Sequence, residues 1–411
     1  MSNLMVAFHS SIIKFVFVLN LLLSKPQRRH LLAFLHGIIL CEGRVNISQI
    51  RRSTNRDRDL SCMTRFLQES PWGSKHVTNQ RFSYLMETIR QTRATRGDTR
   101  PITFLSLDDT LCKKERSTVE MERLDFHYSH SEGKSVWSHS LVTAHVVTGD
   151  LSVAWDFRSY FRKEDCIERN IPFKSKNDLA IELIELYSSS PDEHVYVLID
   201  SWYTSKKRID ACAQKGFHVI GAFRSNRMIA PFRMKIKAST FASTVLRPTD
   251  LCPVTVDGQT YKVYAYEGPL SNMENVRVFL SWEDKFDPKK PPFCLMCTDT
   301  SLDVVTVLRH YAVRWQIEVG YRYFKELLGF DQYQYLSHKG IERFWTIQFL
   351  AYTFLALEQA KEKRHSPSFA LGDMVRRIRK DCLGQLILYA YEQGWAQKPL
   401  AEVLKNLRLY S

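Results

Sequence analysis

One stretch of this sequence, from Tyr311 to Lys325, sorts its polar and apolar residues onto opposite sides when it is folded as a helix. At about 100° per residue, its aromatic and charged side chains fall within roughly 100° of arc. That polar face comprises Tyr311, Arg314, Trp315, Glu318, Arg322 and Lys325. The opposite, core-facing side, when the helix is continued to Leu328, comprises Val313, Ile317, Phe324, Leu327 and Leu328. One carboxylate ringed by cations and aromatics suits a metal-assisted reaction on a phosphate backbone. A solvent-exposed face with ordinary (i, i+4) ion pairs is the plainer alternative.

Two apolar runs elsewhere in the chain end on acidic residues. The run that begins at Thr103 ends in the pair Asp108-Asp109, and the run that begins at His194 ends at Asp200. Both runs predict buried strands that stop at an Asp, so that each carboxylate lies at a sheet edge. Two such strands side by side, with Glu318 from a packed helix, would form the cage of hard oxygen ligands that Mg²⁺ prefers. For either Asp alone, a turn or a helix cap is the simpler interpretation.

The composition favours a nucleic-acid partner. The 411 residues carry a net charge of +14 with a pI of about 9.3, while a hydrophobic share of 44% is ordinary for a folded protein. An acidic membrane is the competing partner, and residues 4–23 form the apolar stretch that could serve it. Because this stretch carries His9, Lys14 and Asn20 and lacks the flanks of a signal peptide, we expect a buried helix there. Nine cysteines without a regular framework indicate reduced thiols.

The patterns predict three strands, with a hairpin across Gly149, followed by helices over 177–188 and 205–215 that alternate with the Asp200 strand and a strand over 217–223. This order is typical of an α/β protein with a ribonuclease H-like catalytic core. The expected parts are an N-terminal helical DNA-binding domain (1–100), the first part of the core (101–225), an inserted β-rich subdomain (226–300), the second part of the core with the Glu318 helix (301–362) and a C-terminal helical region (363–411). Helices expected over 46–53 and 60–67 resemble a helix-turn-helix only loosely, so a plain bundle is nearly as good an account. A surplus of six positive charges over residues 51–100 favours DNA contact.

With these residues the chain resembles the DDE transposases of bacterial insertion sequences, specifically the fourth numbered insertion-sequence family and its relatives. The hallmark of that family is Tyr, two residues, Arg, three residues, Glu, six residues and Lys. It is met in full by Tyr311, Arg314, Glu318 and Lys325.

The acid motifs of that family fit less closely. The second acid is usually followed by a small residue and an aromatic, and the segment Asp200 to Tyr203 fits, except that Trp202 replaces the usual Gly or Ala. The first acid is followed at the second position by Thr or Ser, which fits Asp108 best and leaves Asp109 open. The resemblance covers about residues 100–345.

The resemblance implies metal-dependent cleavage and rejoining of DNA in the bacterial cytoplasm, at the nucleoid. It implies that Asp108, Asp200 and Glu318 are the catalytic residues and hold two Mg²⁺ ions, for which Mn²⁺ can substitute. The expected DNA-binding residues are Tyr311, Arg314, Trp315, Arg322, Lys325 and Tyr203. The expected partners are double-stranded DNA at the terminal inverted repeats of an element, target DNA and a second copy in a homodimer. Members of that family typically cut through a hairpin at the element end.

Other functions remain open on the same sequence. A structure-selective nuclease would use the same three acids without strand transfer. A transposase remnant would bind DNA without catalysis, although the presence of all three acids argues against it. A basic peripheral membrane protein built on residues 4–23 is a third and weaker alternative.

Overall fold

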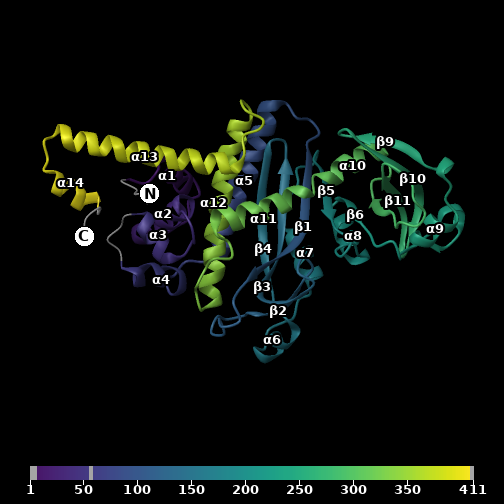
Figure 1. Cartoon of the computed structure of the whole chain (residues 1–411), viewed down its shortest axis with the longest axis horizontal. Helices are drawn as coiled ribbons and strands as arrows, with labels where there is room; N and C mark the ends of the chain where they lie inside the picture. The colour runs from purple at the N-terminus through teal and green to yellow at the C-terminus, as the bar shows by residue number, and fades with distance from the viewer. Residues whose placement is uncertain (1–6, 55–58, 408–411) are drawn as a thin grey trace.

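The computed structural model of the chain describes residues 7–54 and 59–407. Figure 1 shows helices from both ends of the chain on one side, a sheet-and-helix core in the centre and a β-rich lobe on the other side. The core strands are β1 (Ile102–Lys113), β2 (Asp125–Ser129), β3 (Lys134–Thr148), β4 (Leu151–Tyr160), β5 (His194–Ile199) and β6 (His218–Ala222). The remaining strands are β7 (Met228–Ile229), β8 (Ile236–Lys237), β9 (Cys252–Val256), β10 (Gln259–Leu270), β11 (Met273–Glu283) and β12 (Phe293–Cys297).

These twelve strands of the described residues form one mixed sheet. Its order is β2-β3-β1-β5-β6-β12-β11-β10-β7-β8, with β4 paired to β3 and β9 paired to β10. The strand β12 pairs with both β6 and β11, so the lobe continues the core sheet. Residues 226–300 hold the strands β7 to β12, and this lobe is joined to the core by backbone hydrogen bonds as well as by the chain.

The centre of the core is β1, antiparallel to β3 and parallel to β5, which is in turn parallel to β6. The expectation that this first strand ends at Asp108 was wrong, because β1 continues to Lys113. Its last residues pair with β3, from Asp109 opposite Val142 to Lys113 opposite Ser138. The hydrogen-bond ladder between β1 and β3 thus provides partners for backbone groups beyond Asp108. The strand β5 does end immediately before Asp200, as expected.

Several other expected elements are confirmed. A hairpin joins β3 and β4 across Gly149, whose φ of +54° suits a tight turn. The helices that flank the core strands are α6 (Lys163–Glu168), α7 (Lys176–Glu185) and α8 (Lys206–Gln214), and the lobe holds α9 (Ala238–Thr244). The strand β2 was not expected, so four strands precede the first core helix.

The N-terminal part is helical, as the sequence predicts. Its helices are α1 (Ser10–Val18), α2 (Lys25–Leu40), α3 (Ile47–Ser53), α4 (Leu60–Gln68) and α5 (Ser74–Arg96). The turn expected between α3 and α4 includes residues 55–58, which lie outside the described residues. One continuous buried helix over 4–23 was wrong for the part that is described, since α1 spans nine residues and the left-handed φ angles of Asn20 and Leu22 end it. Among the described helices, none is long and apolar enough to span a membrane.

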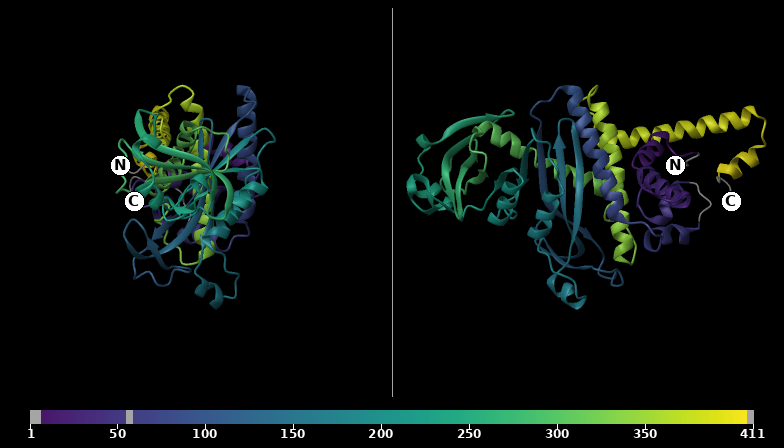
Figure 2. Two further views of the ribbon diagram at one scale, coloured as in Figure 1. Left: turned by 90° about the vertical axis from the view of Figure 1, so that its right-hand side faces the viewer. Right: turned by 180° about the vertical axis from the view of Figure 1, so that it is seen from behind.

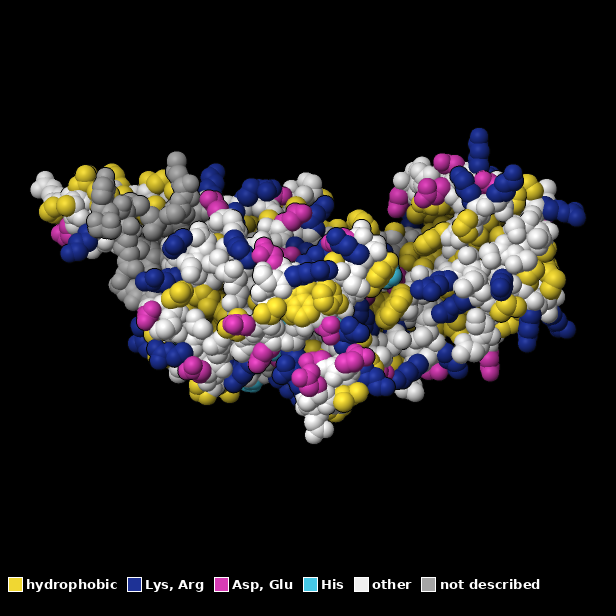
Figure 3. All heavy atoms as spheres, turned by 60° about the horizontal axis from the view of Figure 1, so that its bottom comes forward, with side chains coloured by type: hydrophobic (Ala, Val, Ile, Leu, Met, Phe, Trp, Pro, Cys, Tyr) yellow, Lys and Arg dark blue, Asp and Glu magenta, His cyan; other side chains and the backbone are white. Residues whose placement is uncertain are grey.

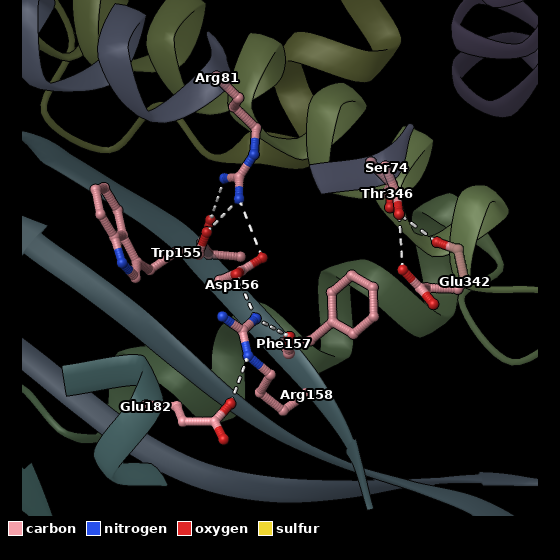
Figure 4. A network of polar contacts seen from close by, with 10 residues as sticks. Ser74, Arg81, Trp155, Asp156, Phe157, Arg158, Glu182, Glu342 and Thr346 are labelled. Atoms are coloured by element: carbon pink, nitrogen blue, oxygen red, sulfur yellow. Dashed lines mark hydrogen bonds and ion pairs between the residues drawn. The ribbon is translucent and has the colours of Figure 1, made fainter. Parts of the chain in front are cut away.

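Two long helices, α5 and α12 (His338–Lys363), run side by side along the sheet, and both views of Figure 2 are consistent with this packing. Figure 4 shows how α5 is fixed to β4: the buried guanidinium of Arg81 points at the strand, donates to the carbonyl oxygen of Trp155 and lies 3.4 Å from Asp156. Arg158 continues the network from Asp156 to Glu182 on α7. Beyond α12, α13 (Leu371–Trp395) and α14 (Leu400–Leu407) extend away from the core (Figure 1).

Candidate active site

The stretch from Tyr311 to Lys325 forms two helices, so the expectation of one helix was wrong. Figure 1 shows α10 (Val304–Ala312) and α11 (Trp315–Leu328) nearly end to end. Between them the backbone makes tight i→i−3 hydrogen bonds, from Val313 to His310 and from Gln316 to Val313. Arg314 lies at this junction with helical φ and ψ angles and therefore stays on the same side as Glu318, one turn later.

The first acid, Asp108, lies in the middle of β1, where α11 packs against the sheet. Its pKa is raised well above the ordinary value, chiefly by burial and then by the nearby charges of Glu318, Asp109 and Asp200. One Asp108 oxygen accepts the main-chain N–H of Asp109 at 2.8 Å. Since the charges of Glu318, Asp109 and Asp200 all act on Asp108, the three expected acids lie close enough to influence one another's charge.

Arg314 partly neutralises this centre. Its Nη1 atom lies 3.5 Å from an oxygen of Asp108 and 3.6 Å from an oxygen of Glu318. Burial lowers the pKa of Arg314, but Tyr311 and the acids outweigh burial, so the pKa is raised and the side chain stays charged. A single guanidinium nitrogen thus draws two of the acids toward the same point.

The second acid, Asp200, is fixed by the backbone at the carboxyl end of β5. Its Oδ1 atom accepts the main-chain N–H groups of Trp202 at 3.0 Å and Tyr203 at 2.9 Å, which closes a turn directly after the strand. The hydroxyl of Thr204 lies 2.9 Å from the carbonyl oxygen of Asp200 and also contacts that of Ala222 in β6. Main-chain N–H groups therefore fix the position of the Asp200 carboxylate, and no bound ligand is needed to hold it.

Asp109 is engaged elsewhere. Successive residues of a strand point to opposite faces, so its side chain leaves β1 on the side away from that of Asp108. One oxygen accepts from Lys176 of α7 at 2.5 Å and the other from the hydroxyl of Tyr203 at 3.2 Å. Lys176, which the sequence did not single out, also lies 5.7 Å from the ring of Trp202. Because both Asp109 oxygens already have donors, the geometry favours Asp108 as the acid that faces Glu318.

The acids form a suitable donor set for a hard divalent ion, although they are not drawn together as ligands. Across residues 7–54 and 59–407, no three His, Cys, Asp or Glu side chains are grouped closely enough to hold a metal ion as they stand. The half-buried carboxylates around Asp108 nevertheless repel one another, and the positive charge of Arg314 offsets this repulsion only in part. Carboxylate oxygens are the ligands that Mg²⁺ prefers, so the residues fit the expected ion.

The remaining expected residues surround this centre at different depths. Trp315 is 63% exposed and Arg322 is exposed, whereas Tyr311 and Lys325 are half-buried. Tyr203 is only 1% exposed, so its ring is not accessible to a base. It packs on the guanidinium of Arg208, 4.7 Å away, and serves Asp109 and Asp200 instead.

Two further residues near the acids went unnoticed in the sequence. Tyr321 is one turn beyond Glu318 and shares a 2.6 Å hydrogen bond with Thr143 of β3. Burial raises the pKa of the Tyr321 hydroxyl, and the charges of Asp108 and Glu318 raise it further. Its helical spacing from Glu318 was the available signal, whereas Lys176 has no such signal because its contact with Asp109 exists only in the folded sheet.

Comparisons with known families gave two matching family models. A family described as "DDE superfamily endonuclease" matches residues 18–239, more than half of the chain, and this segment includes Asp108 and Asp200. A family described as "Transposase DDE domain" matches residues 174–354, which include Asp200 and Glu318. A comparison with curated proteins gave no match. The chain therefore belongs to the DDE superfamily of endonucleases, and its transposase DDE domain makes it a phosphoryl-transfer enzyme of DNA transposition.

Proposed function

We propose that this chain performs cut-and-paste transposition of a bacterial insertion sequence of the fourth numbered family. The observation that carries the proposal is the meeting of Asp108, Glu318 and Arg314 at one point, beside the turn that fixes Asp200. Arg314 and Glu318 belong to the Tyr-Arg-Glu-Lys pattern by which the chain resembles that family.

We assign Asp108, Asp200 and Glu318 as the ligands of two Mg²⁺ ions, with Mn²⁺ as a functional substitute. Bound there, two such ions would activate the attacking oxygen and stabilise the leaving oxygen of the phosphodiester. The chain's own part is to hold Asp200 in its turn, to keep Asp108 half-buried on β1 and to present Glu318 from α11. Arg314 must withdraw from the carboxylates to admit the ions, and a DNA phosphate is the partner that its released guanidinium would take.

The outer residues are assigned to DNA at the terminal inverted repeats and at the target. Arg322 and Lys325 are assigned to phosphates, because they lie on α11 beyond Glu318. The exposed ring of Trp315 is assigned to a base unstacked at a hairpin end, with Trp202, 43% exposed, as a second candidate. Tyr311 packs against Phe293 and lies near Arg314, so its role is to position that arginine. A homodimer would place one site at each element end.

The proposal is tested by incubating the protein with DNA that carries the gene's own flanking inverted repeats and Mg²⁺, and resolving the products on a denaturing gel. Wild type should yield a cut at the repeat boundary and a hairpin intermediate. D108N should yield neither, whereas D109N should cut, since Asp109 is tied to Lys176 and Tyr203. No cleavage by wild type would reject the proposal, and cleavage by D108N would reject the metal assignment.

A structure-selective nuclease is the second candidate, because one matching family is described as an endonuclease. The two functions differ in what happens to the released 3′-hydroxyl. A pre-cut end supplied with target DNA should be joined by a transposase and left unjoined by a nuclease.

A further inference from the structure

The segment that follows β6 is strongly basic. Residues 211–249 contain seven Lys or Arg residues and no Asp or Glu. Within it, β7 and β8 pair as a short hairpin whose loop includes the turn Pro231–Arg233. We call residues 224–237 the basic hairpin. Its cations are Arg224, Arg227, Arg233, Lys235 and Lys237.

These five cations are free of acidic partners within the described residues, where none of the ion pairs includes them. Four are exposed and Arg227 is half-buried. Burial and the neighbouring charge of Arg224 both lower the pKa of Arg227, as expected where cations crowd together without a carboxylate. Such a surface is complementary to a polyanion.

The tip of the basic hairpin carries an exposed aromatic side chain in an unfavourable backbone conformation. Phe232 is 82% exposed and has a φ of +53°, and the next residue, Arg233, has a φ of +63°. Left-handed φ angles favour Gly or Asn, and a bulky aromatic rarely adopts them. Two nearby methionines, Met228 and Met234, are also exposed. Packing within the chain does not account for this arrangement, and strain of this kind gathers at functional sites.

The root of the basic hairpin is tied to the catalytic edge of the sheet. The guanidinium of Arg227 donates to the carbonyl oxygen of Thr204, whose hydroxyl contacts the carbonyl oxygens of Asp200 and Ala222. Because β5 and β6 are parallel, Asp200 and the start of the basic hairpin lie at the same edge. Phe232 lies five positions after Arg227, so at most about 18 Å separates their Cα atoms. This distance corresponds to about five base pairs of duplex.

We propose that the basic hairpin binds the DNA duplex beside the cleavage site and that Phe232 inserts between neighbouring base pairs. This inference rests on the proposed function and adds a contact that it does not contain. The cations hold phosphates on both sides of the tip, and the ring unstacks one base step, as apolar wedges do in other DNA complexes. A second copy of the chain is a poorer occupant, since both surfaces would be cationic. Figure 3 shows Lys and Arg side chains on both sides of the hollow between core and lobe, where a duplex would pass.

The ring is tested with permanganate, which oxidises unstacked thymines, on a duplex that carries the flanking inverted repeat. Wild type should create a reactive thymine within about six base pairs of the cut, and F232A should abolish it and weaken binding about tenfold. F232W should restore both. F126A is the matched control, because Phe126 is an exposed phenylalanine on β2, at the opposite end of the sheet, and should behave as wild type.

Stability separates a contact residue from a structural one. F232G relieves the left-handed φ, so its melting temperature should equal or exceed that of wild type while thymine reactivity is lost. A lower melting temperature for F232G would show that the ring supports the fold, and it would overturn the inference. Equal thymine reactivity in wild type and F232A would overturn it as well. A change in the oligomeric state of F232A without a change in its DNA binding would also overturn the inference.

The charges are tested by R233Q/K235Q/K237Q, which should reduce the slope of log affinity against log salt by about two to three units. The control, K361Q/K363Q/R364Q at the end of α12, removes the same charge and should leave the slope unchanged. The same slopes in both variants would contradict phosphate contact by the basic hairpin. If wild type fails to cut DNA but shows Phe232-dependent unstacking, the proposed function fails and this inference stands. If wild type cuts DNA and F232A gives the same thymine reactivity as wild type, only this inference fails.

Discussion

Asp200 and Glu318 face the same site from supports of different stiffness. Asp200 follows a central strand, and its carboxylate accepts two main-chain N–H groups. Glu318, in contrast, lies in the first turn of α11, directly after the junction with α10. Its contact is the side chain of Arg314, at 3.6 Å. The sheet side of the site is therefore formed in the free protein, while the helix side is held by an ion pair that DNA and metal would rearrange. This difference predicts which substitutions act on chemistry and which act on stability.

The largest effect is expected at the helix side. E318Q removes a metal ligand and one negative charge, so cleavage of an element end should fall at least about 10³-fold while end binding stays within a few-fold of wild type. E326Q is the matched control, because Glu326 is an exposed acid on the same helix. Gel-based cleavage and fluorescence anisotropy measure the two quantities. Normal cleavage by E318Q would remove Glu318 from the ligands.

R314Q should separate metal binding from catalysis. Without the guanidinium beside Asp108 and Glu318, Mg²⁺ should bind the DNA-free protein roughly fivefold more tightly, because a competing cation is gone. Cleavage should still fall, about 10²-fold, since the arginine no longer takes a phosphate. Isothermal titration calorimetry gives the affinity, and R322Q is the control. An affinity that does not change would show that Arg314 does not compete with the ion.

Low pH should reduce the stability of the sheet side through the buried histidine His139. Burial lowers the pKa of His139 on β3 to about 3; its Nε2 atom donates to the Glu122 carbonyl oxygen and its Nδ1 atom accepts from Tyr333. The unfolded imidazole titrates near 6.5, so below about pH 6.5 the unfolded chain binds the additional proton. Stability should therefore fall with falling pH, by about 2 kcal/mol from this group at about pH 5.

The measurement is denaturant unfolding near neutral pH and near pH 5. H139Q should reduce the loss of unfolding free energy between the two conditions, whereas H130Q should not, because His130 is exposed. Equal acid sensitivity in wild type and H139Q would refute this source of the pH dependence.

The smallest effect is expected at Tyr203, a buried support of the sheet side. Y203F removes the hydroxyl that donates to Asp109 but keeps the main-chain N–H that donates to Asp200. The free energy of unfolding should fall by about 1 kcal/mol, and cleavage should change by less than about tenfold. Y323F on α11 serves as the control. A loss of cleavage as large as that of E318Q would place Tyr203 in the chemistry.

What the sequence predicted correctly follows from local patterns. The apolar run before Asp200, the helix and strand after it, and the hairpin across Gly149 are each encoded by neighbours in the chain, and the structure contains all of them. The charge pattern of the Glu318 segment also brought Arg314 and Glu318 together, since an (i, i+4) spacing survives a break that precedes it.

What it missed depends on distant contacts. The strand β1 passes through Asp108 because β3 supplies partners beyond it. The junction between α10 and α11, just before Trp315, contains no Gly or Pro. It arises because the two helices pack into different clusters: Val307 and Tyr311 pack with β5, β6 and strands of the lobe, whereas Phe324 and Leu328 pack with the main core. Tyr203 looked like a DNA contact in sequence, and only the fold shows that it is enclosed between Asp109 and Arg208.

The most direct test of the central claim is a crystal structure of the protein with Mn²⁺ and a DNA end, with the ions located by anomalous scattering. The account predicts two manganese peaks coordinated by Asp108, Asp200 and Glu318, with Arg314 moved from the carboxylates to a phosphate. Peaks bound by Asp109 in place of Asp108, or no peak shared by these three acids, would contradict it.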